Sequence, residues 1–279
     1  MSYAPDKPPA ETADEFHAYV LREFKKISAE FLALSITAPP PLPNPDLIWQ
    51  WNAEAVAPFS IQARDPSRVS LVIVGGRKWV RLLTMPGDSS IAGSGSNERT
   101  DMQYSSDLTN GQEGRERWMT HSIMFPGDYV DPPPSPASAT PWNFGVVFDW
   151  HNSALGAGQA NMQIQAMPVT GSDASRPTGL GIKMAWGTQA APQEKYYPIG
   201  PIVRNVPYNF KHHVFWTAAS TGSFDAWVNG RLVMQYKGPT LYAGQETYCK
   251  LARYGSPTGQ PCAVLHGRLR LGKTEASVA

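Results

Sequence analysis

From residue 47 onward, polar and apolar residues alternate with a period of two, and this pattern constrains the fold more than any other feature of the chain. Successive side chains of an extended strand point to opposite faces, so the alternation predicts strands with one buried face. Asn229-Gly230 separates two such segments and is a strong signal for a tight hairpin turn. The predicted strands are 69–74, 78–84, 118–125, 144–150, 161–167, 181–186, 211–217, 224–228, 231–236, 247–253 and 263–271.

Many short strands, without a helix of comparable length between them, favour an all-β domain made of two packed sheets, of the jelly-roll kind. With 279 residues and 42% hydrophobic content, the chain is long enough to bury one substantial core. The net charge of +1 predicts no general attraction to nucleic acid or to a membrane surface. No apolar stretch approaches the roughly 18 residues that a membrane-spanning helix needs.

Residues 1–45 follow a different pattern. Apolar residues spaced three or four apart form one stripe on a helix predicted over residues 12–35, and a stiff proline-rich spacer follows it. Such a helix cannot bury its stripe alone, so we expect it to pack on the domain, on copies of itself or on a particle protein. We predict an assembly anchor over residues 1–45 and a β-domain over 46–279. The stripe consists of Phe16, Val20, Phe24, Ile27, Phe31 and Leu34.

Localisation, cysteines and metals are less informative. No apolar run follows Met1, so we expect synthesis in the cytoplasm and association with a particle such as a virion. Cys249 and Cys262 are too few for a disulfide framework, and free buried thiols are favoured over a single hairpin bridge. His212 and His213 point to opposite faces of a strand and have no third ligand nearby, so we predict no metal and no cofactor.

Three segments far apart in the chain carry polar side chains at every second position, which places each polar set on one face of a strand. If the three strands are neighbours in one sheet, the sets form a polar, titratable groove. The region 204–279 holds nine Lys and Arg against three Asp and Glu, which favours an anionic ligand there. The sets are Arg99, Asp101 and Gln103, then Asp149 and His151, then Tyr248, Lys250 and Tyr254.

In this order and spacing, from Trp49 to the C-terminus, the segments resemble the signature motifs of alginate-lyase-like and heparin-lyase-like polysaccharide lyases. In those enzymes an Arg-x-Glu strand, a Gln-x-His strand and a Tyr-Phe-Lys-x-Gly-x-Tyr strand line the sugar cleft. The resemblance implies a concanavalin-like jelly-roll sandwich that cleaves uronate polysaccharide by β-elimination. It implies catalytic roles for His151, Tyr254, Tyr248 and Arg99, and a substrate-binding role for Lys250.

Other candidates for substrate binding lie beside these residues. Asp101, Gln103 and Asp149 belong to the same polar sets. Trp150 lies near a predicted strand end, where a flat ring can stack on a sugar.

The chain departs from the family pattern at three positions. Asp101 stands where the family has Glu, and Arg253 stands where it has Gly. Asp149 replaces an amide that donates a hydrogen bond to the uronate carboxylate, and an ionised Asp149 would repel that carboxylate by about 4 kcal/mol at 4 Å and an effective dielectric near 20. Either Asp149 is protonated, or it orients His151, or the reaction is not the one this protein performs.

Ordinary structural interpretations stay open for each candidate. Arg99 and Asp101 are also consistent with a simple ion pair, and His151 with a structural strand residue. Two classes of function remain: a depolymerising enzyme carried on a larger assembly such as a phage particle, and a non-catalytic virion protein with a lectin-like jelly roll. In both classes we expect a homo-oligomer or a particle protein, joined through residues 12–35.

Overall fold

The computed structural model describes residue 16 and residues 18–27, 44–89, 95–135, 143–153, 160–168, 178–188 and 191–279. The chain divides into two compact units, Met1–Pro43 and Asn44–Ala279. In the first unit residues 18–27 are helical, and Phe16 and Phe24 are 55% and 64% exposed. Phe31 and Leu34 of the predicted stripe lie outside the described residues. No helix in the described part of the chain is long and apolar enough to cross a membrane.

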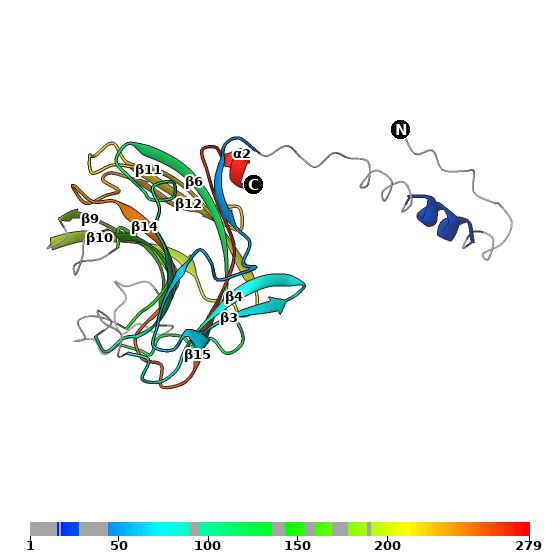
Figure 1. The fold of residues 1–279 in the computed structure, drawn as a ribbon, viewed down its shortest axis with the longest axis horizontal. Helices are drawn as coiled ribbons and strands as arrows, with labels where there is room; N and C mark the ends of the chain where they lie inside the picture. The colour runs from blue at the N-terminus through cyan, green and yellow to red at the C-terminus, as the bar shows by residue number, and fades with distance from the viewer. Residues whose placement is uncertain are drawn as a thin grey trace. The chain divides into compact units, whose positions relative to one another are not determined.

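The second unit is a sandwich of two antiparallel sheets (Figure 1). One sheet has eight strands in the order β13-β12-β11-β6-β15-β4-β3, with β1 paired to β15. Its strands are β1 (Leu47–Trp51), β3 (Val69–Val74), β4 (Arg77–Thr84), β6 (Arg115–Met124), β11 (Pro207–Trp216), β12 (Ser223–Val228), β13 (Arg231–Lys237) and β15 (Cys262–Gly272).

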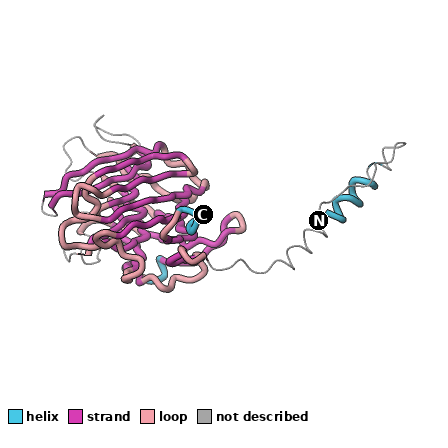
Figure 2. The backbone as a smooth tube through the Cα atoms, turned by 90° about the horizontal axis from the view of Figure 1, so that it is seen from above, coloured by secondary structure: helices cyan, strands magenta, loops and turns pink. Residues whose placement is uncertain are grey.

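The other sheet has seven strands in the order β10-β9-β8-β7-β14-β5-β2. Figure 2 shows that strands make up most of this unit. Two short helices, η1 (Pro66–Arg68) and α2 (Glu275–Val278), complete the described elements of this unit. The seven strands are β2 (Ser60–Ala63), β5 (Glu98–Tyr104), β7 (Gly145–Asn152), β8 (Met162–Met167), β9 (Gly179–Thr188), β10 (Ala191–Gly200) and β14 (Thr247–Gly255).

The inner faces of the two sheets enclose one apolar core. Phe148 and Trp150 of β7 point into it from the seven-stranded sheet, and Trp216 of β11 points into it from the eight-stranded sheet. The rings of Trp150 and Trp216 meet edge to face, with centroids 5.4 Å apart. Burying each such side chain contributes roughly 1.5–3 kcal/mol, so these contacts between the sheets hold the sandwich together.

The structure confirms the predicted all-β sandwich and finds a strand at each predicted segment. Asn229 and Gly230 have φ of 48° and 81°, the left-handed values that the predicted hairpin between β12 and β13 requires. Cys249 and Cys262 are buried and not bonded to each other, as predicted. The sequence interpretation missed β1, β2 and β10. β10 contains Pro192 and Pro198, and proline is tolerated there because β10 is an edge strand.

Candidate functional site

The three motif strands lie side by side, because β14 pairs with β5 on one side and with β7 on the other. Lys250 is opposite Gln103 of β5 and Asp149 of β7. On either side of this level, Tyr248 is opposite His151, and Tyr254 is opposite Arg99. The motif residues that were predicted to share one sheet are therefore neighbours in it. That they line a groove remains a prediction.

Alternation along β7 decides which side chains belong to this surface. Phe148 and Trp150 point into the core, so Asp149 and His151 point to the outer face of the sheet. Trp150 is only 2% exposed and packs against Trp216, so its predicted role in stacking on a sugar is wrong. The reason is the period of two along a strand: Trp150 lies between the outward-pointing Asp149 and His151, so its own side chain points inward.

Charged groups cluster at the centre of the outer face. Nζ of Lys250 lies 3.1 Å from Oδ2 of Asp101, and Nε of Arg99 lies 3.3 Å from the same oxygen. The guanidinium of Arg99 also lies over the ring of Tyr254, 4.3 Å from its centroid. Burial alone would lower the pKa of Lys250, but Asp101 and then Asp149 outweigh burial and raise it. Lys250 is thus held as a cation with one carboxylate between it and Arg99.

His151 and Tyr248 form a second pair beside this cluster. Their rings are stacked, with centroids 5.3 Å apart and an interplanar angle of 26°. Nδ1 of His151 lies 3.0 Å from the carbonyl oxygen of Asn152, which accepts and therefore selects the tautomer with the hydrogen on Nδ1. Nε2 is then the basic nitrogen. Burial raises the pKa of Tyr248, so its hydroxyl keeps its proton.

Asp149 and Asp101 are both buried, and Oδ1 of each has no hydrogen-bond partner among the described protein atoms. They differ at the other oxygen: Oδ2 of Asp101 lies beside the cations of Lys250 and Arg99, whereas both of those cations are turned to Asp101 and not to Asp149. Burial raises the pKa of Asp149, an effect that His151 and Lys250 partly offset. Burial thus favours the neutral acid at this position.

A polar row crosses the sheet at the level of Lys250. It passes through six neighbouring strands, a span of roughly 24 Å at a strand spacing of about 4.8 Å. The sequence interpretation missed Gln163, Lys183 and Tyr196 of this row, and it also missed Gln165, two residues along β8. A signal for the two glutamines was present, because they alternate with the apolar Met162 and Ile164. The row consists of Gln103, Lys250, Asp149, Gln163, Lys183 and Tyr196.

Several buried acceptor atoms on this face have no hydrogen-bond partner within the protein. Buried polar atoms in folded proteins are almost always paired, so these acceptors need donors from ordered water or from a bound ligand. Sugar hydroxyls are such donors. The atoms are Oδ1 of Asp101, Oε1 of Gln103, Oδ1 of Asp149 and Oε1 of Gln165.

A family model described as polysaccharide lyase matches residues 46–267, which include every motif residue above. This chain belongs to that polysaccharide lyase family. No curated protein matches it. The family assignment agrees with the resemblance of the three motifs.

Solved structures share the lyase fold at low sequence identity. The chain is similar to the endo-β-1,4-glucuronan lyase of the fungus Trichoderma reesei, with TM-score 0.62 and 13% identity, over 83% of this chain and 98% of that one. It is also similar to the alginate lyase AlyC3, with TM-score 0.50 and 8% identity, over 69% of this chain and 74% of that one. The binding domain of Paraclostridial Mosquitocidal Protein 1 matches with TM-score 0.51 and 8% identity, over 82% of this chain and 49% of that one.

An open cavity of about 430 Å³ adjoins the end of the motif strands in this lyase-family domain. Ser153, directly after β7, and Glu246, directly before β14, both line it. Nε2 of Gln112 donates to Oε2 of Glu246 at 2.6 Å, so one wall is held in place by a hydrogen bond. The polar surface thus continues beyond His151 and Tyr248.

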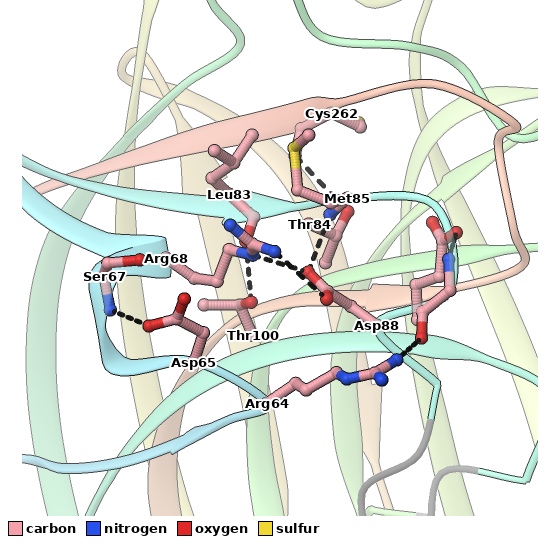
Figure 3. A network of polar contacts seen from close by, with 12 residues as sticks. Arg64, Asp65, Ser67, Arg68, Leu83, Thr84, Met85, Asp88, Thr100 and Cys262 are labelled. Atoms are coloured by element: carbon pink, nitrogen blue, oxygen red, sulfur yellow. Dashed lines mark hydrogen bonds and ion pairs between the residues drawn. The ribbon is translucent and has the colours of Figure 1, made fainter.

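A hydrogen-bond network supports β5, the strand that carries Arg99 and Asp101 (Figure 3). Oγ1 of Thr100 donates to the carbonyl of Leu83 at 2.7 Å, which ties β5 to the strand β4 of the opposite sheet. Asp88 pairs with Arg68 at 2.8 Å (Figure 3). The backbone carbonyl of Asp88 also accepts the backbone N–H of Arg99. Hydrogen bonds therefore anchor the strand that carries Arg99 and Asp101. Within the described ranges, no group of three or more His, Cys, Asp or Glu is placed to hold a metal ion.

Proposed function

We propose that this chain cleaves a uronate polysaccharide by β-elimination on the outer face of the seven-stranded sheet. One observation carries the proposal: two cations, a histidine with a free basic nitrogen and a protonated tyrosine lie together on neighbouring strands. Each step of the reaction needs one of these groups.

The reaction removes the proton on C5 of the uronate, next to its carboxylate. His151 takes this proton on Nε2, the nitrogen left basic by the hydrogen bond to Asn152. A double bond forms between C4 and C5, and the C4–O4 bond breaks with its electron pair remaining on O4. Tyr248 gives its hydroxyl proton to that oxygen. The rings of His151 and Tyr248 are stacked, so the base and the acid can reach neighbouring atoms of one sugar.

Arg99 and Lys250 would stabilise the negative charge that develops on the carboxylate as the C5 proton leaves. Tyr254 has a supporting role: its ring lies under the Arg99 guanidinium, and its hydroxyl accepts a hydrogen bond from Nδ2 of Asn97 at 3.1 Å. We therefore assign the acid to Tyr248 and the positioning of Arg99 to Tyr254.

The family and the polar row support a substrate class. The structural relative with TM-score 0.62 is a glucuronan lyase by its description, and AlyC3 is an alginate lyase. A polar row of roughly 24 Å suits an oligosaccharide rather than one sugar. We propose a β-1,4-linked polyuronate, with polyglucuronate as the first candidate.

The test is an incubation with polyglucuronate, alginate and bacterial capsules, with formation of unsaturated uronate ends followed by ultraviolet absorbance. His151→Ala should lower kcat by about 10²–10⁴-fold, the contribution of a positioned base. The matched control is His213→Ala, a half-buried histidine on the opposite sheet, which should leave kcat unchanged. Equal loss in both variants, or full activity in His151→Ala, would refute the assignment of the base.

A second candidate, a non-catalytic glycan-binding protein of a larger assembly, is favoured by Asp149 in place of an amide. In that case the polymers should bind without any absorbance signal. We also propose that residues 12–35 attach the domain to copies of itself or to a particle such as a virion, because Phe16, Leu21 and Phe24 are 55%, 50% and 64% exposed.

A further inference from the structure

Asp149 lies at the centre of the polar row, and every neighbouring strand presents polar groups to it. His151 lies on the same strand. The uncharged Gln163 is opposite on β8, and beyond it the ammonium of Lys183 on β9 is paired with Glu194. The groups on β14 and β5 that interact electrostatically with Asp149 are Lys250, Tyr248, Cys249, Arg99 and Asp101.

The charged groups around Asp149 carry a net positive charge when Asp149 itself is not counted. Arg99 and Lys250 share the single carboxylate of Asp101, so one positive charge is left over. Lys183 and Glu194 form a neutral pair, 3.6 Å apart. An ionised Asp149 would cancel the surplus, and a bound uronate would then add an uncompensated negative charge to a buried site. A neutral Asp149 leaves one positive charge for one sugar carboxylate.

We propose that Asp149 determines specificity for an anionic sugar by binding it in the neutral form, with the carboxylic acid donating its hydrogen to the uronate carboxylate. The acid then serves in place of the amide of the family motif. This inference deepens the proposed function and rests on its assignment of the substrate-binding face.

Geometry and burial agree with this role. Nζ of Lys250 lies 3.1 Å from Oδ2 of Asp101, and Oδ1 of Asp149 has no hydrogen-bond partner among the protein atoms. An ionised carboxylate that is 4% exposed needs such partners, whereas a neutral acid costs far less to bury. Burial also raises the pKa of Asp149.

The consequence is a coupling between sugar binding and one proton. Above the pKa of Asp149 in the free protein, the site must take up a proton before it binds a uronate, so Kd should rise about tenfold for each pH unit. A neutral sugar chain needs no such proton. The pH dependence therefore distinguishes a specificity role from a merely structural one.

Binding is best measured in a His151→Ala background, so that the polymer is not cleaved. The ligands are a polyglucuronate oligosaccharide and, as neutral control, the β-1,4-glucan oligosaccharide of equal length. Calorimetry at pH 5–9, repeated in two buffers of different ionisation enthalpy, gives Kd and the number of protons taken up. Asp149→Asn keeps the shape of the side chain and cannot ionise, Asp149→Gln restores the family amide, and Asp225→Asn on the opposite sheet is the matched control.

We expect the tenfold rise per pH unit, with one proton taken up, for polyglucuronate in the background protein and in Asp225→Asn. Asp149→Asn or Asp149→Gln should bind with a Kd that is independent of pH and equal to the low-pH value. A flat profile in the background protein would overturn the inference, as would the same slope in both Asp149 variants or the loss of uronate binding in both. Absence of elimination products with His151 intact would instead refute the proposed reaction and leave this binding result standing.

Discussion

Acid should unfold the sandwich through histidines in its core. His121, His212 and His266 are all at most 2% exposed. Burial lowers the pKa of His212 to about 3 and that of His266 to about 4, and it lowers the pKa of His121 well below its ordinary value. In the unfolded chain each imidazole returns to a pKa near 6.5. The unfolded state therefore binds protons first as the pH falls.

The size of the effect follows from these pKa values. Above pH 6.5 the histidines are neutral in both states and cost nothing. Below it, each loses about 1.4 kcal/mol of folding stability per pH unit until its folded-state pKa is reached. Between pH 7 and pH 5, His212 and His266 together should remove about 4 kcal/mol, and His121 acts in the same direction. That is a large part of the usual 5–15 kcal/mol.

His212→Leu isolates one contribution. Leucine is close to histidine in volume and suits the rings of Phe148, Phe210 and Phe224 around this position. Urea unfolding at pH 7 and pH 5 gives the free energy of unfolding, and the loss between the two should be about 2 kcal/mol smaller than in the wild type. His213→Leu, one residue along on the outer face, is the control and should keep the wild-type loss.

The comparison of pH 7 with pH 5 within each variant removes any constant change that leucine causes. Carboxylates titrate equally in both proteins and cancel in the same way. If His212→Leu loses as much stability as the wild type between pH 7 and pH 5, His212 is not held neutral in the core, and the reasoning from burial is wrong.

Two further outcomes are expected. Gly255→Ala should lower the free energy of unfolding by roughly 1–3 kcal/mol in urea titrations, because the added Cβ would collide with the carbonyl of Phe144 where β14 pairs with β7. The control is Gly127→Ala, whose Cβ meets only Asn205 at 3.7 Å and which should be neutral. Equal effects of the two substitutions would contradict the steric argument. Deleting residues 1–43 should leave a folded domain that sediments as a monomer, whereas the full chain should sediment as an assembly. A full-length protein that is already monomeric would contradict the assembly proposal.

The sequence alone was sufficient for whatever depends on local geometry. Alternation follows from the steric period of two in any strand, so it correctly placed Arg99 with Asp101, and Asp149 with His151, on shared faces. The Asn229-Gly230 turn was equally readable, because few residues adopt left-handed φ. Trp150 was misassigned although the same alternation places it in the core beside two outward neighbours.

Only the tertiary structure decided which strands are neighbours and in what register. Period-two patterns are alike in most strands, and pairing between segments a hundred residues apart depends on how the whole sandwich packs. The placement of Lys183 and Gln163 in line with Lys250 could not be read from local pattern for that reason. The burial of Asp149 also comes from packing, and burial is what shifts its pKa. The type of each side chain is local, whereas its electrostatic environment is set by residues from other strands.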